Sequence, residues 1–455
     1  MIKKILITAE NYYPKHSGVS QYLRYLSRNL SKRKINVHIM CQSYTGKYYK
    51  KKLFGSTVHY SPLLIGSMGE PFKVIEKKNG IAEFIQKLNV DLVYANNHNS
   101  LAVIKACKKI NLPVIYGFHG VGLLCPLKIR FLKPDNSLCF NERSILNCLE
   151  CKLKARLKLK HILCRNGITK LFEIIRLVRK YNYAERILDS ADARLTNSKY
   201  SSKLLRKKER TYGLEQMIET KGKHGYYKVD PTHFKKKYDL DKYILITSRI
   251  HNTKGHIYLI EALKYISKNI KLAIVGSNSL WFKDKMDLGY YAKEIRKLIN
   301  KLNLKDRIVF TGRLNIKEIR QAYSGALCTV VPSIWIETYG NVVPESLACE
   351  TPVIAPLQGG QAAFLKEEDS FLIVPDKKTK SDPSMLRWSE IYKDTYLVDY
   401  SDKVIMDAAD QMRLVFDDRE KAKEKAKSFR KRMKSQYTWK KTANLVYNRL
   451  TELQF

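Results

Sequence analysis

The chain contains 455 residues, of which 44% are hydrophobic and 11% aromatic, so its length and composition predict two or three folded domains. These values exclude a disordered chain, and 21 glycines and 13 prolines are too few for a collagen-like or low-complexity protein. Lys and Arg total 84 against 43 Asp and Glu, which gives a formal net charge of +41. Such a charge attracts nucleic acid, anionic lipid or a phosphorylated substrate, and by itself it does not distinguish these partners.

The N-terminus and the cysteine content indicate a cytoplasmic location. No run of the sequence approaches the roughly 18 consecutive apolar residues of a membrane span. Lys3 and Lys4 resemble the basic start of a signal peptide, but the apolar run at residues 5–9 is too short, and Glu10 follows it. We therefore expect nine reduced cysteines in a cytoplasmic protein rather than a disulfide-bonded scaffold.

Short β-type runs alternate with helical patterns through the first part of the chain. A helix is predicted at residues 19–30, where the apolar side chains share one helical face. This alternation predicts a parallel sheet with helices on both faces, and we assign residues 1–210 to this first doubly wound domain. Its predicted strands are 5–9, 37–41, 91–95 and 113–118.

Residues 121–185 interrupt this alternation with a stretch rich in cysteine and basic residues. Within it, residues 155–180 combine many Lys and Arg with apolar side chains, which indicates basic helices with an apolar side. Four cysteines have the spacing C-x₁₃-C-x₈-C-x₂-C, whose last pair is typical of tetrahedral zinc sites. A structural zinc site is one interpretation, and four small apolar residues without metal are the other. These cysteines are Cys125, Cys139, Cys148 and Cys151.

A second alternating series follows a linker expected at residues 211–229. It predicts a second doubly wound domain at residues 230–430, and the remaining segment, 431–455, contains a predicted helix at 439–453. Ligands of open parallel sheets bind at the carboxyl ends of the strands, so we expect two domains that face a cleft and bind one substrate each. The predicted strands are 244–248, 272–275, 308–311, 328–331 and 352–355, and the predicted helices are 256–267, 291–302, 316–324 and 343–349.

Two glutamates that flank a tight turn carry the clearest chemical signal. Glu337 follows a predicted strand, and Glu345 lies eight positions later, near the start of the next helix. Between them, Gly340 lets the backbone approach a ligand, and free amides at the helix start suit an anion or sugar oxygens. Two carboxylates in this arrangement can accept hydrogen bonds from two polyols, one on each side of a diphosphate. The alternative interpretation is that neither glutamate binds a ligand, so that one only starts a helix and the other is only solvated.

The same segment resembles the Glu-x₇-Glu motif of the retaining glycosyltransferases of family four, bacterial group 1 enzymes with the GT-B fold of two Rossmann-like domains. The resemblance implies that Glu337 contacts hydroxyls of the donor sugar and that Glu345 holds the nucleotide ribose. It also implies that the turn amides face the sugar, at Tyr339, Gly340 and Asn341. Thr338 and Glu350 depart from the family pattern, because glycine is usual at both positions.

The resemblance extends in order along the second domain. Arg249 and Lys254 match a pair of cations that bind the donor diphosphate, to which Arg offers a planar fork and Lys a point charge. Gly276 and Gly312 match turns near the nucleotide base. Residues 358–360 match another loop of the cleft.

In the first domain, Gly18 matches a glycine loop whose amides approach the transferred sugar and phosphate, although one glycine is present where two are usual. His119 follows the strand predicted at 113–118 and matches a histidine that lines the donor site. A lone histidine is otherwise more often a surface or core residue. Some family members carry a similar cysteine-rich insertion, and in this fold the final helix crosses back onto the first domain.

The resemblance implies an enzyme that transfers a hexose-type sugar with retention from a UDP or GDP donor to a glycan or a polyprenyl-diphosphate-linked glycan. The acceptor hydroxyl attacks the donor sugar on the same face from which the leaving group departs, and a phosphate oxygen of the donor takes the proton of that hydroxyl. Arg249 and Lys254 neutralise the diphosphate, so we expect no catalytic metal or other cofactor. Asp239 and Asp241 form an Asp-x-Asp that suggests a metal site of the GT-A type, but they lie where a turn is expected.

Family frequency favours a product in bacterial surface polysaccharide, either capsule or lipopolysaccharide. The lipid-linked acceptor and the basic segment at 155–180 predict a peripheral protein at the anionic inner face of the cytoplasmic membrane. Two other functions stay open: a basic nucleic-acid-binding protein and a sugar-nucleotide epimerase. The sequence lacks the motifs of common RNA- and DNA-binding modules, so we expect no nucleic-acid partner.

Overall fold

The computed structural model divides the chain into two compact units. Unit 1 comprises Met1–Met217 and Trp439–Phe455, and unit 2 comprises Ile218–Thr438. The division between them falls inside the linker expected at 211–229. The structure describes residues 2–14, 18–65, 71–124, 146–147, 167–205, 209–214, 218–220, 225–251, 254–276, 287–333, 337–357, 359–363, 365–373, 402–436 and 439–452.

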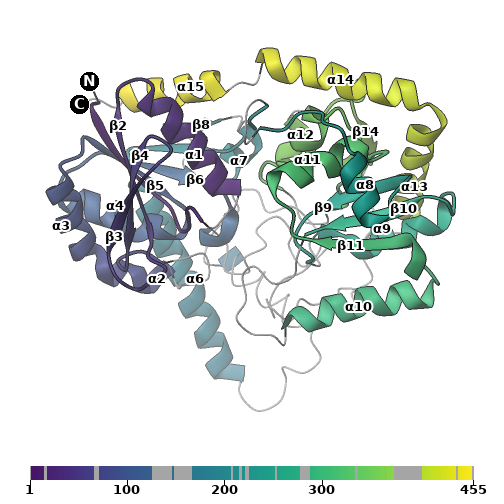
Figure 1. Cartoon of the computed structure of the whole chain (residues 1–455). Helices are drawn as coiled ribbons and strands as arrows, with labels where there is room; N and C mark the ends of the chain where they lie inside the picture. The colour runs from purple at the N-terminus through teal and green to yellow at the C-terminus, as the bar shows by residue number, and fades with distance from the viewer. Residues whose placement is uncertain are drawn as a thin grey trace. The chain divides into compact units, whose positions relative to one another are not determined.

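Unit 1 contains an eight-stranded sheet in the order β3-β4-β2-β1-β5-β6-β7-β8 (Figure 1). Strand β3 pairs antiparallel with β4, and the other neighbouring strands run parallel. At the centre of the sheet, Ile5 lies between Val37 and Leu92, and all three side chains are buried. The strands are β1 (Lys4–Thr8), β2 (Asn36–Gln42), β3 (Tyr49–Leu53), β4 (Ser56–Ser61), β5 (Leu92–Asn96), β6 (Val114–Phe118), β7 (Ala193–Thr196) and β8 (Thr211–Gly213).

The helices of unit 1 pack on this sheet through apolar faces. In α1 (Gly18–Ser31), Tyr22, Leu26 and Leu30 recur at helical spacing and are buried, whereas Arg28 is exposed. Helix α3 ends at Leu88, and Asn89 follows it with a left-handed φ of 49° that turns the chain into β5. The other helices are α2 (Pro71–Val74), α3 (Lys78–Leu88), α4 (Ser100–Lys109), α6 (Gly167–Asp189) and α7 (Lys199–Lys203).

The last helix, α15 (Trp439–Thr451), belongs to unit 1 and packs beside α1 (Figure 1). The indole of Trp439 is buried, with its ring centroid 5.7 Å from that of Tyr22 and 5.1 Å from that of Tyr25. Large aromatic side chains bury much apolar area, so this contact fixes the helix to unit 1. The predicted return of the final helix to the first domain is therefore confirmed.

Unit 2 contains a six-stranded parallel sheet in the order β11-β10-β9-β12-β13-β14. Alternate residues of β9 enter two different core clusters: Ile244 and Ile246 enter one, and Tyr243 and Leu245 enter the other. Because side chains alternate across a strand, both faces of the sheet are covered by helices. The strands are β9 (Tyr243–Thr247), β10 (Lys271–Val275), β11 (Ile308–Gly312), β12 (Thr329–Val330), β13 (Val353–Pro356) and β14 (Phe371–Ile373).

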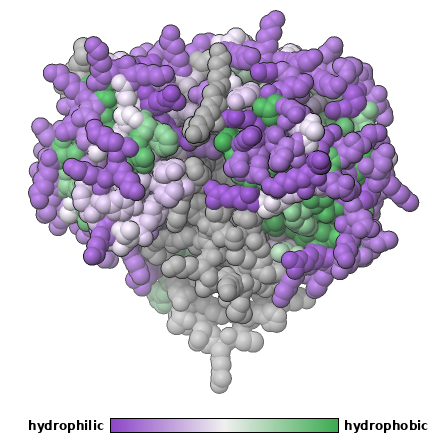
Figure 2. Space-filling view, viewed as in Figure 1, coloured by the Kyte–Doolittle hydropathy of each residue, from purple (hydrophilic) through white to green (hydrophobic). Residues whose placement is uncertain are grey.

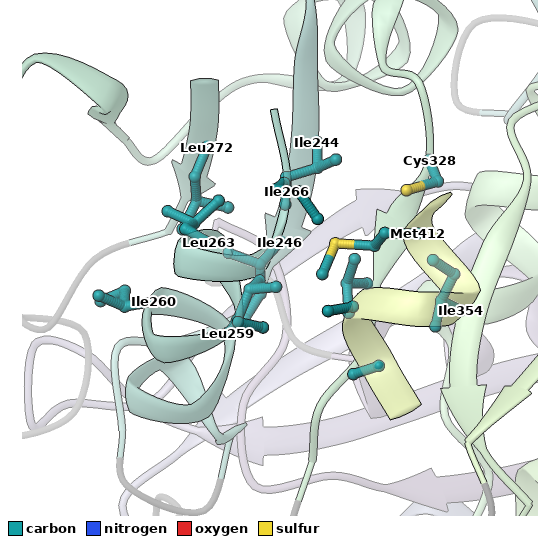
Figure 3. Close-up of a cluster of buried hydrophobic side chains, with 14 of the residues drawn as sticks. Ile244, Ile246, Leu259, Ile260, Leu263, Ile266, Leu272, Cys328, Ile354 and Met412 are labelled. Atoms are coloured by element: carbon teal, nitrogen blue, oxygen red, sulfur yellow. The ribbon is translucent and has the colours of Figure 1, made fainter. Parts of the chain in front are cut away.

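Helices from distant parts of the sequence complete these two cores. Figure 3 shows Met412 of α13 lying between Ile244 of β9 and Ile354 of β13, and all three side chains are buried. Helix α11 starts with a capping box, in which Asn315 accepts from the Glu318 amide at 3.0 Å. The helices are α8 (Thr232–Tyr238), α9 (His256–Ala262), α10 (Asp287–Lys301), α11 (Ile316–Gly325), α12 (Val342–Ala348), α13 (Asp402–Asp417) and α14 (Arg419–Gln436).

Where the predicted elements fall within the described residues, they agree with the observed ones to within a few residues, except that the helix predicted at 256–267 ends as α9 at Ala262 and continues as a short 3₁₀ helix, Leu263–Tyr265. Of the basic helices predicted at 155–180, residues 155–166 lie outside the described part, and α6 begins at Gly167. On the face shown in Figure 2, hydrophilic residues cover most of the described surface, as the high charge predicts. Among the described helices, none is both long and apolar enough to span a membrane.

Candidate active site

A pocket of about 200 Å³ lies at the carboxyl ends of β9 and β12 in unit 2. Ligands of open parallel sheets bind at this edge, because the loops that leave the strands meet there. Of the residues expected to bind the donor, Lys254, Glu337, Gly340 and Asn341 line the pocket. The remaining lining residues are Ile246, Thr247, Ser248, Val330, Val331, Pro332, Ser333 and Val342.

Gly255 holds the loop after β9 against the segment after β12. Its φ is +70°, and a Cβ at this position would lie 1.8 Å from the carbonyl oxygen of Pro332. Only glycine fits such an approach. The adjacent Lys254 is therefore held at the edge of the pocket.

The ammonium group of Lys254 forms an ion pair with the carboxylate of Glu337. Ser333 donates a second hydrogen bond to the same carboxylate oxygen, at 3.3 Å. Each of the two charged side chains is 20% exposed, so the pair is partly shielded from water. The pocket thus holds a cation, which suits phosphate, beside a carboxylate, which suits hydroxyl groups.

The turn between Glu337 and α12 is held by close backbone contacts. Gly340 has φ +89°, and a Cβ there would lie 2.9 Å from Oε1 of Gln361. The amide of Gly360, in the short 3₁₀ helix Gly359–Ala363, donates to the carbonyl of Glu337 at 2.7 Å. The side chain of Tyr339 is buried in the core and not in the pocket. Of the loop predicted at 358–360, position 358 is outside the described residues.

Glu345 lies beneath the pocket and does not line it. Its carboxylate is buried and accepts a hydrogen bond of 3.1 Å from the hydroxyl of Tyr323. That hydroxyl is 2.7 Å from Oγ1 of Thr247, which does line the pocket. Burial raises the pKa of Glu345 to about 7, and hydrogen bonds from Tyr323 and Tyr226 oppose the rise. Sequence reasoning missed Tyr323, because a tyrosine on the buried face of α11 is typical of a core residue.

The other cation expected in the donor site, Arg249, is exposed two positions after the end of β9 and is not among the residues that line the pocket. His251 lies between it and Lys254 in the loop, and burial, together with these two cations, lowers the pKa of His251 to about 3. The imidazole is therefore neutral at pH 7. Gly312 ends the edge strand β11, where its carbonyl accepts a hydrogen bond of 2.9 Å from the Gly276 amide, and neither glycine lines the pocket.

In unit 1, His119 directly follows β6, and its Nε2 is 2.9 Å from Oδ1 of Asn96, the last residue of β5. Gly117 makes room for this amide, since a Cβ there would lie 2.0 Å from Asn96 Oδ1. Burial lowers the pKa of His119 to about 4, and Glu10 partly opposes the shift. His119 is thus neutral at pH 7, and with the amide oxygen as acceptor, Nε2 carries the proton.

Three other predictions concern positions away from these contacts. Gly18 is the exposed first residue of α1, and the preceding residues, 15–17, are outside the described part. Asp239 has a left-handed φ of 50° at the end of α8 and pairs with Lys271 at 2.8 Å, which agrees with a turn. The four cysteines of the predicted zinc site also lie outside the described residues, and in the described part no group of metal-ligating side chains occurs.

Residues 16–212 match the family "Glycosyltransferase Family 4", and residues 230–390 match "Glycosyl transferases group 1". The chain is thus similar to glycosyltransferases in both segments, and to the group 1 glycosyltransferases in the second. The first matched segment falls in unit 1 and the second in unit 2, so the similarity to the group 1 glycosyltransferases concerns unit 2.

Two curated glycosyltransferases resemble part of the chain. A glycosyltransferase of Methanocaldococcus jannaschii is 31% identical over 152 residues, which are 33% of this chain and 35% of that protein. An N-acetylgalactosamine-N,N'-diacetylbacillosaminyl-diphospho-undecaprenol 4-alpha-N-acetylgalactosaminyltransferase of Campylobacter jejuni is 29% identical over 133 residues, 29% of this chain and 32% of that protein. The chain thus matches about a third of the length of these curated relatives.

Solved structures show the fold. The Anabaena protein HepE in complex with UDP and glucose superimposes with a TM-score of 0.64 at 17% identity, over 99% of this chain and 100% of that protein. A sucrose-phosphate synthase of Thermosynechococcus elongatus gives a TM-score of 0.67 at 18% identity, over 99% of this chain and 100% of that protein. The prediction of the GT-B fold is confirmed.

Proposed function

We propose that the protein is a retaining glycosyltransferase that moves a sugar from a nucleotide-diphosphate donor to a glycan or lipid-linked glycan. The observation that carries this proposal is the adjacency of Lys254 and Glu337 in the pocket, beside the Gly340 turn. The solved complex of HepE with UDP and glucose supports a UDP sugar as the donor to test first, with GDP sugars as the alternative.

In this proposal the charged groups in and around the pocket have separate tasks. Lys254 and the neighbouring Arg249 stabilise the negative charge that develops on the leaving diphosphate, as preorganised cations do. Glu337 accepts hydrogen bonds from hydroxyls of the donor sugar, and the ribose lies toward Glu345. Because two cations neutralise the diphosphate, the reaction needs no divalent metal.

In this proposal His119 contributes as a neutral imidazole, because its pKa is lowered to about 4 and it adds no charge to the reaction. The acceptor hydroxyl attacks from the face that the diphosphate leaves, and its proton passes to a donor phosphate oxygen. The new glycosidic bond forms as the bond to the diphosphate breaks.

We propose a lipid-linked acceptor and a role in bacterial surface polysaccharide, in capsule or lipopolysaccharide. The Campylobacter relative, whose name specifies a diphospho-undecaprenol substrate, supports this acceptor class. An acceptor of this kind would place the protein at the inner face of the cytoplasmic membrane as a peripheral protein. Its high positive charge suits the anionic headgroups there.

A transfer assay with purified protein tests the proposal. UDP and GDP sugars are supplied with and without a polyprenyl-diphosphate-linked glycan, and products are separated by mass spectrometry and by anomeric configuration. We expect transfer that depends on the acceptor, retains the anomeric configuration and survives EDTA. Epimerised donor without transfer would favour an epimerase, and loss of activity that Mg²⁺ or Mn²⁺ restores would contradict metal independence.

A further inference from the structure

A chain of buried hydroxyls connects the pocket wall to Glu345. Thr247 ends β9 and lines the pocket, Tyr323 lies on α11, and Glu345 lies on α12. Oγ1 of Thr247 is 2.7 Å from the Tyr323 hydroxyl, which is 3.1 Å from Oε2 of Glu345. The Tyr323 side chain is fully buried, so water does not compete for these hydrogen bonds.

The chemistry of the three groups fixes the direction of the chain. An ionised carboxylate only accepts hydrogen bonds, so the single phenolic proton of Tyr323 must point to Glu345. The Tyr323 oxygen can then only accept from Thr247, which uses its own proton in that contact. The lone pairs of Thr247 are left for the pocket, where they can accept from a hydroxyl group of a ligand.

A proton on Glu345 permits the opposite direction. A carboxylic acid can donate to Tyr323, which then donates to Thr247, and the Thr247 proton becomes free to point into the pocket. The pocket wall would then present a donor where a ligand hydroxyl needs an acceptor. A hydrogen-bonded chain therefore links the ionisation of a buried carboxyl to the polarity of the pocket.

We propose that Tyr323 is a positioning residue of the donor site, which keeps Glu345 as an acceptor and turns the lone pairs of Thr247 toward a donor hydroxyl. The proposal rests on the proposed function, since it assigns the pocket to a nucleotide sugar. The hydroxyl that would donate a hydrogen bond to Thr247 belongs to the ribose or the sugar of that donor. Tyr323 acts through Glu345 and Thr247 and does not itself line the pocket.

Within the described residues, few titratable groups act on Glu345. Tyr323 of α11 and Tyr226 of the segment before α8 donate to its carboxylate, and Cys349, after α12, faces it. Burial raises the pKa of Tyr323 and Cys349 far above neutrality, so neither changes charge near pH 7. Glu345 is therefore the group of this cluster whose ionisation can change donor binding near neutral pH.

Calorimetric binding of UDP and of GDP to full-length protein, measured from pH 5.5 to 8.5, tests the proposal. We expect the wild-type affinity to fall as the pH drops below about 7. Tyr323→Phe removes one donor to the carboxylate, so it should weaken nucleotide binding about 10- to 100-fold at pH 7 and move the fall to higher pH. The turnover number at saturating donor should stay close to that of the wild type.

Tyr243→Phe is the matched control, because it also removes a buried phenol, whose hydroxyl donates to the Ala322 carbonyl at 2.7 Å and not to Glu345. It should keep the wild-type affinity and pH profile. Thr247→Val should weaken nucleotide binding as Tyr323→Phe does. Thr247→Ser keeps a hydroxyl group at this position, so it should bind nucleotide as the wild type does. This pair tests the chain even if Tyr323→Phe does not fold.

Two results would overturn the inference in distinguishable ways. If the wild type binds a nucleotide but Tyr323→Phe and Thr247→Val keep its affinity and pH profile, Tyr323 is only a core residue, and the proposed function stands. If the wild type binds neither UDP nor GDP and transfers no sugar, the proposed function fails, and the inference fails with it.

Discussion

Lys254 and Glu337 are 83 positions apart in the sequence, and the fold brings their charged groups into direct contact. The contact depends on two loops that leave neighbouring strands, one after β9 and one after β12. Each residue therefore holds the other in the pocket before any ligand binds. Substitution of either residue also changes the environment of its partner.

We predict different kinetic defects for these two residues. Glu337→Gln should lower the turnover number on the order of 100-fold, because a contact to the reacting sugar is lost at the transition state. Lys254→Met should mainly raise the KM for the donor, because a phosphate-binding cation is lost. Steady-state kinetics with varied donor would distinguish the two defects.

The surface ion pair of Lys237 with Glu318, at 2.7 Å, provides a matched control in the same unit. Exposed ion pairs contribute little to stability, so Lys237→Met and Glu318→Gln should behave like the wild type. Near-normal kinetics in both Glu337→Gln and Lys254→Met would refute the assignment of the pocket to the donor.

Two stacked histidines in unit 1 predict a loss of stability in acid. Nδ1 of His38 is 2.9 Å from Nε2 of His59, and both rings are buried. Burial and nearby lysines lower the pKa of each from 6.5 to about 4. The unfolded chain then binds more protons between pH 6.5 and 4, so their contribution to stability is complete above pH 6.5 and is lost as the pH falls toward 4.

Thermal unfolding from pH 7 to pH 4.5 measures this effect. The wild-type Tm should drop by several degrees, and His59→Gln should reduce the slope of that drop, because one buried imidazole no longer gains a proton on unfolding. Substitution of the exposed His233 with Asn is the control and should leave the slope unchanged. Equal slopes in His59→Gln and the wild type would exclude the histidine pair as the cause.

The cysteine-rich stretch predicts about one structural zinc per chain, held by Cys125, Cys139, Cys148 and Cys151. Elemental analysis of protein purified without added metal should detect the zinc. Its content should fall to near zero in a Cys148→Ser, Cys151→Ser double variant, and replacement of the buried Cys107 should not lower it. Zinc-free wild-type protein that keeps its fold would favour the alternative of four small apolar residues.

Membrane association should depend on anionic lipid and on the basic segment at 155–180. Each Lys or Arg near an anionic surface contributes roughly 1 kcal/mol, and exposed charges are screened over about 8 Å at physiological ionic strength. Flotation with anionic liposomes should therefore show binding that weakens with salt. The protein should not bind neutral liposomes.

Neutralising Lys and Arg within 155–180 should abolish flotation. Replacing the exposed Lys421, Lys427 and Lys431 of α14 with glutamine removes charge elsewhere and should have a smaller effect. If both sets of substitutions reduce flotation equally, binding depends on net charge alone. If the wild type does not float with anionic liposomes, membrane docking is contradicted.

Sequence periodicity sufficed for most of the central elements. Strands buried on both faces produce short apolar runs, so β9 and β10 could be located to within one residue. Elements with weaker patterns were not predicted: β3 is an exposed edge strand rich in lysine, and β14 has only three residues. Their pairing depends on neighbouring strands and not on local sequence.

Glu350 shows how a departure from a family pattern acquires a physical reason in the structure. Its φ is +60°, the left-handed conformation in which glycine is favoured, which accounts for the usual glycine at this position. The carboxylate of Glu350 pairs with Arg430 and Lys228. These ion pairs offset part of the backbone strain, and neither partner could be identified from the sequence.

The alternation of strands and helices could be read from the sequence, as could the positions of Lys254 and Glu337 in loops after strands and of His119 at a strand end, because these depend on residue type and local spacing. Which of these groups meet depends on the tertiary fold. The strand order placed β12 beside β9, which joined Lys254 to Glu337, and the packing of α11 beneath the pocket placed Tyr323 against Glu345. Contacts of this kind depend on how distant segments pack, and periodicity along the chain carries no information about that packing.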